Sequence, residues 1–307
     1  MDERLRKDSS GRGIALVGPG AIGSTVAALA YEAGQHVTLC GRTPRESIEL
    51  RPDDGDPVIV PGPVRTDPAQ ITGPVDVVLL AVKDTQNEGA APWLARLCDE
   101  TTIVCALQNG VEQVERVGRY CPTEKRPAVV PCVLWFSAET QSEGWVRLRT
   151  PVRLVVPDSP EARRLAETLR GPRLVVDTDP DFITAAWHKL LLNAVFGLMV
   201  LTGRKAGMFR RDDIAALARD YLAECLAVAR AEGAGLGDEV IEATVRLCTE
   251  LPEDMTTSIL TDRELGRPLE WDIRNGVIVR KAAAHGIATP ISDVLVPLLA
   301  AAGDGPG

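Results

Sequence analysis

The chain has 307 residues, of which 45% are hydrophobic and 25% charged, a balance that is ordinary for a soluble globular protein of about two domains. Its net charge of −9 argues against nucleic acid or an anionic membrane as the main partner. Seven scattered cysteines without a C-x-x-C pair indicate buried thiols in a reducing compartment, the cytoplasm.

We expect neither a targeting signal nor a membrane span. Residues 1–7 are charged and have no apolar core, so residues 1–12 are predicted to form a disordered tail rather than a signal peptide. A membrane span needs about 18 apolar residues without a charge, and the sequence contains no such stretch.

A glycine-rich turn follows the first apolar run of the chain. Residues 14–17 predict a strand, and apolar positions recur at helical spacing over 22–33. Between them, Gly18 allows a sharp turn, Gly20 lets the backbone approach a pyrophosphate, and Gly23 lets helix and strand pack closely. The helix N-terminus then binds phosphates. The pattern predicts a dinucleotide site formed by Gly18, Pro19, Gly20, Ala21, Ile22 and Gly23. A structural turn without a ligand is the alternative.

The end of the second predicted strand, 37–40, indicates which dinucleotide binds. An acidic residue about 20 residues after the glycines holds the ribose 2′-hydroxyl of NAD. Arg42 stands there instead, and a guanidinium can bind a 2′-phosphate and stack on adenine. The sequence therefore favours NADP over NAD. Arg42 as a solvated surface charge is the alternative, and Arg45 nearby could assist or be solvated itself.

The rest of the first 180 residues alternates between strand-like and helix-like patterns. Further strands are predicted at 76–82, 102–107, 129–136, 145–148, 154–156 and 174–176, with helices at 90–97, shortly after 110, and at 159–170. The strand at 76–82 is apolar throughout, as in a parallel strand buried on both faces. We predict a doubly wound α/β domain of the Rossmann type over residues 13–180, with an antiparallel extension near its end.

After residue 180 the strand patterns disappear. Long helices are predicted at about 181–202, 212–232, 238–250, 270–285 and 290–302. The chain therefore divides into the Rossmann-type domain and an all-helical domain over residues 181–307, which we expect to carry the substrate and catalytic residues.

Polar residues follow two of the predicted central strands. Lys83, with Gln86 three positions on, comes directly after the strand at 76–82, and Asn109 follows the strand at 102–107. Ligands of open α/β sheets bind at the carboxyl ends of strands, so these side chains are candidates for contacts to cofactor or substrate. The alternatives are that Lys83 is a strand-end charge exposed to water and that Asn109 only belongs to a turn.

The first helix of the second domain contains a lysine in an apolar setting. Lys189 and Asn193 are four residues apart and share one helix face. Burial lowers the pKa of an ammonium, and a lysine tuned toward neutrality is a suitable general acid. A lysine that extends its charged end into water is the alternative. Downstream, Ser258 could donate to a substrate carboxylate, and Glu270 at the head of a helix could orient Lys189 or a substrate hydroxyl.

At this point the chain resembles the ketopantoate reductases (2-dehydropantoate 2-reductases) over nearly its whole length. The resemblance rests on the turn at 18–23, Ala81–Gln86, Gln108–Gly110, Trp187–Lys189 with Asn193, Ser258, Arg267–Glu270 with Asn275–Gly276, and Ala284–Pro290. It implies NADPH-dependent reduction of a 2-oxo acid, ketopantoate or a close relative, to the 2-hydroxy acid, a step of pantothenate biosynthesis.

The resemblance also implies roles for single residues. Lys189 would protonate the carbonyl oxygen as hydride arrives, and Glu270 would position Lys189 and bind the substrate hydroxyl. The other implied contacts are Asn193 and Ser258 to substrate, Asn109 and Lys83 at the nicotinamide and carbonyl end, Gln86 beside the cofactor, and Asp262 near the substrate loop. A homodimer interface on the helical domain is a further expectation.

Departures from the family pattern fall on the substrate side. Gly197 stands where a second substrate-binding asparagine is common, the stretch at 131–136 is bulkier than usual, and Ser292 replaces an asparagine. A reductase specialised for another carbonyl or imine therefore stays open, and a non-catalytic dinucleotide sensor is a third possibility. The three histidines show no metal-ligand spacing, so no metal is expected.

Overall fold

The computed structural model describes residues 12–305, so all but the last position of the tail predicted over 1–12 lies outside the described residues. The chain divides into two compact units. The first comprises residues up to 108 together with 113–180, and the second comprises 109–112 together with 181 onwards. The four residues at 109–112 therefore belong to the helical unit, which the expectation of two uninterrupted domains did not include.

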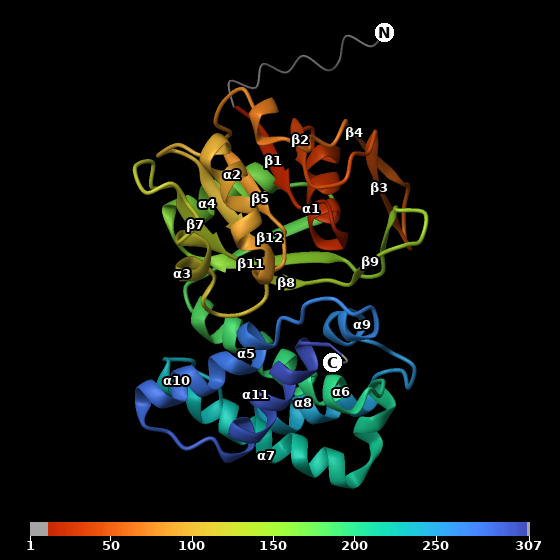
Figure 1. The fold of residues 1–307 in the computed structure, drawn as a ribbon, viewed down its shortest axis with the longest axis vertical. Helices are drawn as coiled ribbons and strands as arrows, with labels where there is room; N and C mark the ends of the chain where they lie inside the picture. The colour runs from red at the N-terminus through yellow and green to blue at the C-terminus, as the bar shows by residue number, and fades with distance from the viewer. Residues whose placement is uncertain (1–11, 306–307) are drawn as a thin grey trace. The chain divides into compact units, whose positions relative to one another are not determined.

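The first unit contains a five-stranded parallel sheet in the order β2-β1-β5-β6-β7 (Figure 1). Its strands are β1 (Ile14–Val17), β2 (Val37–Cys40), β5 (Val77–Leu80), β6 (Ile103–Ala106) and β7 (Ala128–Pro131). Every residue of β1, β5 and β6 is buried, as expected where both faces of a parallel sheet are covered. Ile14 pairs with Val37 on one side and Val77 on the other. The parallel order confirms the predicted α/β class.

Three helices lie between these strands in the chain. They are α1 (Ala21–Glu32), α2 (Asn87–Leu97) and α3 (Gln113–Gly118), with short turns η2 (Pro68–Gln70) and η3 (Asp84–Gln86). A fourth helix, α4 (Pro160–Leu169), follows later in the chain. The local sequence sets the start of α4, because the Ser159 hydroxyl accepts a hydrogen bond from the backbone of Ala162. A buried cluster on α1, including Val26 and Leu29, packs on the sheet.

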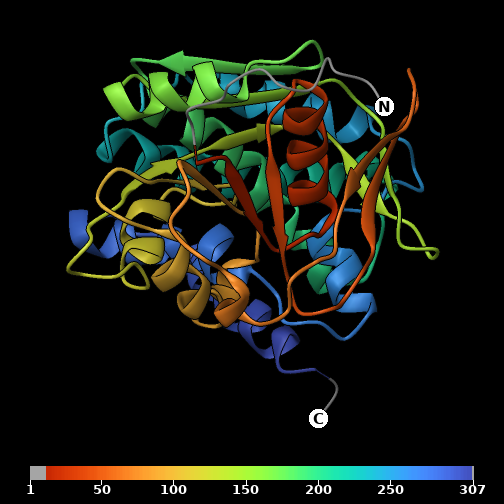
Figure 2. The same cartoon turned by 90° about the horizontal axis from the view of Figure 1, so that it is seen from above.

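Two smaller sheets complete this unit. One has the order β4-β3-β10-β9 and the other β12-β11-β8. Their strands are β3 (Ser47–Pro52), β4 (Val58–Pro61), β8 (Val133–Trp135), β9 (Ala138–Thr140), β10 (Val146–Leu148), β11 (Val152–Pro157) and β12 (Leu174–Asp179). Helix α1 contacts β3 and β4 as well as β1 (Figure 2). The pairing of β8 with β11 is antiparallel, in agreement with the expected extension.

Two features of this unit differ from the sequence-based expectation. Neither the β3–β4 pair nor β9 was predicted, because their alternating patterns are short; β3 and β4 also end at Pro52 and Pro61. The single strand expected over 129–136 divides at Cys132, so that β7 completes the parallel sheet and β8 enters the three-stranded one.

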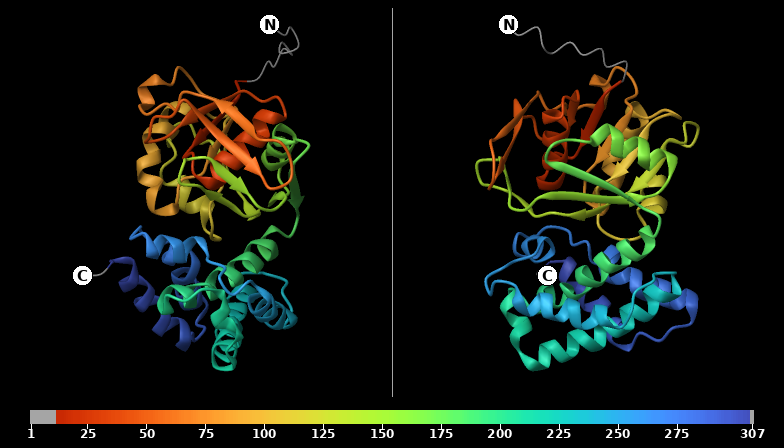
Figure 3. Two further views of the ribbon diagram at one scale, coloured as in Figure 1. Left: turned by 90° about the vertical axis from the view of Figure 1, so that its right-hand side faces the viewer. Right: turned by 180° about the vertical axis from the view of Figure 1, so that it is seen from behind.

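The second unit is helical (Figure 3). Its elements are α5 (Phe182–Val195), α6 (Gly197–Thr202), η4 (Ala206–Arg210), α7 (Asp212–Ala231), α8 (Glu239–Glu250), α9 (Ser258–Glu264), the π-helical segment η5 (Asp272–Gly276), α10 (Val277–His285) and α11 (Pro290–Gly303). Trp187 and Leu191 of α5 pack with Tyr221 and Leu222 of α7 in its core.

The predicted helices are present with three differences. The helix expected over 181–202 divides at Phe196 into α5 and α6. The helix expected over 270–285 begins at Trp271 and opens with the π-helical segment. Neither η4 nor α9 was predicted; the Thr257 hydroxyl caps the start of α9 by accepting from the backbone of Leu260.

By length and composition alone, the segment Phe182–Thr202 would suit a membrane span, with a mean hydropathy of 1.4. In the structure 67% of its most apolar window is buried inside the protein. Core helices of globular proteins have the same length and composition, so the segment by itself does not indicate a membrane.

Candidate active site

The three glycines of the turn after β1 meet different steric constraints. Gly18 has a φ of +96°, and a Cβ there would lie 2.8 Å from the Val82 side chain. A Cβ at Gly23 would lie 2.5 Å from the Gly18 carbonyl oxygen, so only glycine lets α1 pack this closely. Gly20 has no atom within 4 Å of the place of a Cβ. Its backbone is therefore open to a ligand.

The start of α1 fits the pyrophosphate of a dinucleotide. No side chain caps this helix, and its first turn contains no acidic residue. The backbone N–H groups and the positive end of the helix dipole favour an anion at this place. The residues that could hold it are Gly18, Pro19, Gly20, Ala21, Ile22 and Gly23.

Arg42 lies just beyond the end of β2, beside this turn. The preceding residue, Gly41, packs so tightly on the Pro19 ring that a Cβ at position 41 would lie 2.7 Å from Pro19 Cδ. The Arg42 side chain is exposed, whereas Arg45 donates to the carbonyl oxygen of Gly144 at 3.4 Å. A guanidinium at the position of Arg42 can bind a phosphate on the ribose of a dinucleotide.

Lys83 and Gln86 lie in the loop after β5, which is fixed by two contacts. Gln108 Nε2 donates to the carbonyl oxygen of the residue before Lys83 at 2.9 Å. Arg116 forms a bidentate pair with Asp84 at 2.6 and 2.9 Å. Lys83 and Gln86 are both half-buried at the carboxyl end of the central strand. This is where ligands bind in open α/β sheets.

In the helical unit, Lys189 lies on α5 among apolar neighbours. Burial, and next the charge of Arg274, lower the pKa of Lys189 to about 8. The pKa of the adjacent His188 is lowered too, by burial and by the charge of Lys189. At neutral pH the Lys189 ammonium keeps its proton, and it releases that proton more readily than an ordinary lysine does.

A chain of hydrogen bonds links three predicted site residues within the helical unit. Asn193 Nδ2 donates to Asn109 Oδ1 at 3.3 Å, and Asn109 Nδ2 donates to Glu270 Oε2 at 3.4 Å. Glu270 and Asn193 are buried at 6% and 5% exposure. The structure therefore brings together residues from three distant parts of the sequence.

Arg274 extends this chain to Ser258. Its Nη2 donates to Ser258 Oγ at 3.0 Å and lies 3.4 Å from Glu270 Oε2. Arg274 lies in the π-helical segment η5, and such segments are frequent at functional sites. Arg274 was not among the residues predicted from the sequence. It is four residues after Glu270, the same spacing as that of Lys189 and Asn193, but charged and polar residues surround it, so the local sequence does not indicate that it is buried.

Asp262 and Gly197, two further positions singled out in the sequence, both pack against other residues of the helical unit. Asp262 is buried on α9 and lies 3.9 Å from Arg267, across the turn that ends this helix. Gly197 is buried at the start of α6, and a Cβ there would lie 2.8 Å from the side-chain nitrogen of Asn275. Asn275 itself donates to Ala194 O and to the hydroxyl of Tyr221. The space beside Gly197 is therefore filled by protein.

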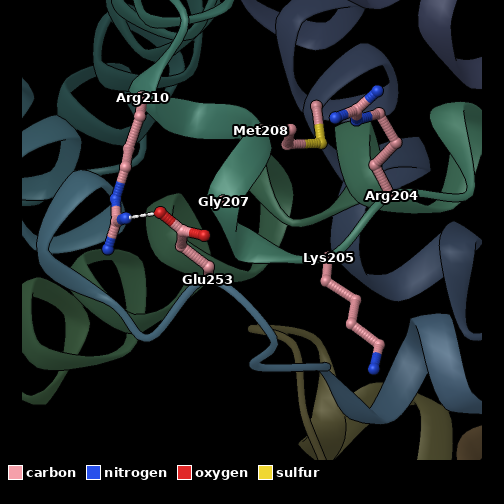
Figure 4. A pocket seen from close by; sticks show the side chains of 6 residues that line it. All are labelled: Arg204, Lys205, Gly207, Met208, Arg210 and Glu253. Carbon is pink, nitrogen blue, oxygen red and sulfur yellow. Dashed lines mark hydrogen bonds and ion pairs between the residues drawn. The ribbon is translucent and has the colours of Figure 1, made fainter.

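A pocket elsewhere in the helical unit includes none of these residues. Figure 4 shows its lining, in which Arg210 pairs with Glu253. The full lining is Arg204, Lys205, Gly207, Met208, Arg210 and Glu253. Among residues 12–305, no group of three or more His, Cys, Asp or Glu side chains could hold a metal ion.

Comparison with known families agrees with this architecture. The family model described as ketopantoate reductase PanE/ApbA matches residues 14–161, and that of its C-terminal part matches residues 181–302. The chain is 65% identical to the 2-dehydropantoate 2-reductase of Mycobacterium tuberculosis, over 96% of this chain and 99% of the relative. It is 36% identical to that of Caulobacter vibrioides, over 94% and 98%.

Solved structures show the same fold. A dimeric ketopantoate reductase from Staphylococcus aureus superposes with a TM-score of 0.85 at 25% identity, over 94% of this chain and 98% of that one. A ketopantoate reductase of the PanE/ApbA family from Ralstonia eutropha gives 0.83 at 29% identity, over 95% and 98%.

Proposed function

Because the chain belongs to the ketopantoate reductase family, we propose that it reduces ketopantoate, or a closely related 2-oxo acid, to the 2-hydroxy acid with NADPH. The observation that carries the chemistry is the half-buried Lys189, whose pKa is lowered to about 8. It lies in a unit where Asn109, Asn193 and Glu270 form one hydrogen-bonded chain.

The reduction needs a hydride at the carbonyl carbon and a proton at the carbonyl oxygen. NADPH, when bound, supplies the hydride. Lys189 donates the proton from Nζ, for which its lowered pKa suits it. Glu270 orients the Lys189 ammonium and accepts a hydrogen bond from the new hydroxyl. Asn193 and Ser258 hold the substrate, and Asp262 supports the loop that follows α9.

The first unit binds the cofactor in this proposal. The open backbone of Gly20 at the start of α1 would hold the pyrophosphate, and Arg42 would bind the 2′-phosphate. Lys83 and Gln86 would contact the nicotinamide side, and Asn109 of the second unit is a further candidate for such a contact. At the end of β2, where an acidic residue would bind the ribose hydroxyl of NADH, the chain has Gly41, Arg42 and Thr43, which supports NADPH over NADH.

The proposal is tested by following NADPH absorbance with ketopantoate and a panel of other 2-oxo acids, with NADH in parallel. We expect turnover of ketopantoate with NADPH, and loss of at least about 1,000-fold in kcat for Lys189→Ala with NADPH affinity unchanged. The exposed Lys205 of the same unit provides the matched control, and Lys205→Ala should retain full activity. Retained NADPH binding without turnover of any 2-oxo acid would contradict the proposal.

We also propose a homodimer in the cytoplasm. The S. aureus relative is described as dimeric, and all seven cysteines of this chain are free thiols. Burial raises the pKa of Cys40 and of Cys98 to about 12, which keeps these thiols protonated and unreactive. Light scattering after size exclusion gives the mass directly, and a monomer at micromolar concentration would exclude the dimer.

A further inference from the structure

The guanidinium of Arg274 is one of the most deeply buried charges in the described part of the chain. Its side chain is 3% exposed, and that of Glu270 beside it 6%. Burying a charge is costly unless it is paired and hydrogen-bonded. Lys189, close enough for its pKa to respond to Arg274, is a second cation. With Lys189 protonated, Arg274, Lys189 and Glu270 together carry one net positive charge, which suits a monoanionic ligand.

The ion pair between Arg274 and Glu270 is longer than a strong charge-assisted hydrogen bond. Their closest atoms lie 3.4 Å apart, whereas charge-assisted hydrogen bonds are about 2.7–2.9 Å long. Elsewhere in the chain, Arg116 and Asp84 form such a bond at 2.6 Å. Glu270 therefore does not saturate Arg274, although the two side chains are four residues apart on one helical segment.

Some N–H groups of the Arg274 guanidinium remain available to hydrogen-bond a ligand. A guanidinium carries five N–H groups. Within residues 12–305, its Nη2 bonds Ser258 and Glu270, and its buried Nε has no hydrogen-bond partner. An unmet buried donor costs about 1–3 kcal/mol. Ser258 accepts from Arg274 through Oγ, so its own hydroxyl proton can be donated to the same ligand.

From this arrangement we propose that Arg274, with Ser258, binds the carboxylate of the 2-oxo acid. The inference rests on the proposed function and names the group that recognises the acid. In a 2-oxo acid the carboxylate is bonded directly to the carbonyl carbon. The residue that binds the carboxylate must therefore lie close to Lys189, the proton donor. Arg274 meets this condition, because its charge acts on Lys189. Arg274 is a binding residue in this role, and the proton still comes from Lys189.

The test compares ketopantoate with its methyl ester, which keeps the reacting carbonyl and lacks the charge. We expect the wild-type enzyme to prefer the acid by about 100-fold or more in kcat/KM. Arg274→Met should lower kcat/KM for the acid by about 100-fold, chiefly through KM, and change that for the ester by less than about threefold. Arg274→Lys keeps a charge without the planar fork and should lose about tenfold for the acid.

Controls separate this role from the alternatives. Arg204→Met removes an exposed arginine from the same unit and should leave both substrates unaffected. Equal losses for acid and ester in Arg274→Met would show that Arg274 acts only by positioning Glu270 or Lys189, and would overturn the inference. The wild-type preference tests it without any variant, since equal rates for acid and ester also overturn it. Wild-type protein that reduces no 2-oxo acid would instead overturn the proposed function.

Discussion

The side-chain amide of Asn193 donates to Asn109 across 84 residues of sequence, at 3.3 Å. Asn109 comes directly after a loop of the Rossmann-type unit, yet it belongs with residues 110–112 to the helical unit. The short segment thus brings a polar side chain to Glu270, which it contacts at 3.4 Å. The polar chain of the site is built from both halves of the sequence within one compact unit.

The first prediction concerns pH. Lys189 must be protonated to act as an acid, so kcat/KM for ketopantoate should fall as the pH rises through about 8. The reverse oxidation needs the neutral amine and should rise over the same range. A substrate carboxylate on Arg274 offsets the charge that depresses the pKa of Lys189. The decline in kcat, which reports the bound complex, should therefore occur at higher pH.

Full pH profiles of both parameters check this. Arg274 and His188 both interact electrostatically with Lys189. The pKa of His188 is itself lowered, so His188 is neutral where the decline occurs. If kcat and kcat/KM declined at the same pH, substrate binding would leave the charge of Arg274 uncompensated, contrary to the prediction.

A second prediction concerns stability. The folded-state pKa of Lys189, about 8, lies below its ordinary value of 10.5, so folding disfavours the protonated form. The wild type should gain stability as the pH rises from about 8 to 10.5, because only the unfolded chain then binds this proton. At pH 7 the full penalty of roughly 3 kcal/mol applies. Lys189→Met should therefore stabilise the protein at pH 7 and lose that advantage near pH 10.

Urea unfolding at pH 7 and pH 10 measures the difference. Lys205→Met, at an exposed site, should be neutral at both values. A Lys189→Met variant that is less stable than the wild type at pH 7 would mean that the ammonium is better stabilised in the folded protein than its burial indicates.

The third prediction separates cofactor binding from packing in the glycine turn. Gly20→Ala adds a Cβ that meets no protein atom, so stability should change by no more than about 1 kcal/mol. NADPH affinity should fall roughly tenfold or more, because the methyl group stands in the way of the pyrophosphate. Gly23→Ala instead meets backbone at 2.5 Å and should destabilise by about 2–4 kcal/mol. Thermal unfolding with NADPH titration distinguishes the two, and a Gly20→Ala variant of normal affinity would exclude a phosphate there.

The fourth prediction concerns the choice between NADPH and NADH. Arg42→Ala should lower kcat/KM for NADPH by about 10- to 100-fold and leave that for NADH nearly unchanged, because only NADPH has the 2′-phosphate. Arg96→Ala removes an equally exposed charge at the end of α2 and is the control. If Arg42→Ala lowered kcat/KM equally for NADPH and NADH, Arg42 would have a general electrostatic role and would not recognise the 2′-phosphate. Arg45→Ala then shows whether the second arginine contributes.

Local patterns in the sequence predicted much of this molecule. The glycine turn and the apolar strands β1, β5 and β6 are encoded by neighbouring residues, and so is the spacing of Lys189 and Asn193. The β3–β4 pair was missed because two short strands stabilise each other only once paired. Arg274 was missed because its burial depends on how the segment around η5 packs, which no local pattern shows. Asn109 was expected at the site, but its place in the helical unit depends on contacts far along the chain.

The pair Gly197 and Asn275 has a consequence for how this chain can vary. An asparagine introduced at position 197 would bring its Cβ within 2.8 Å of the Asn275 amide. Asn275 cannot move aside without giving up its bonds to Ala194 and Tyr221. A side chain added at position 197 would therefore act on the hydrogen bonds of Asn275, and through them on the contact between α7 and the segment around η5. The effects of substitutions at positions 197, 221 and 275 on the free energy of unfolding should be coupled rather than additive.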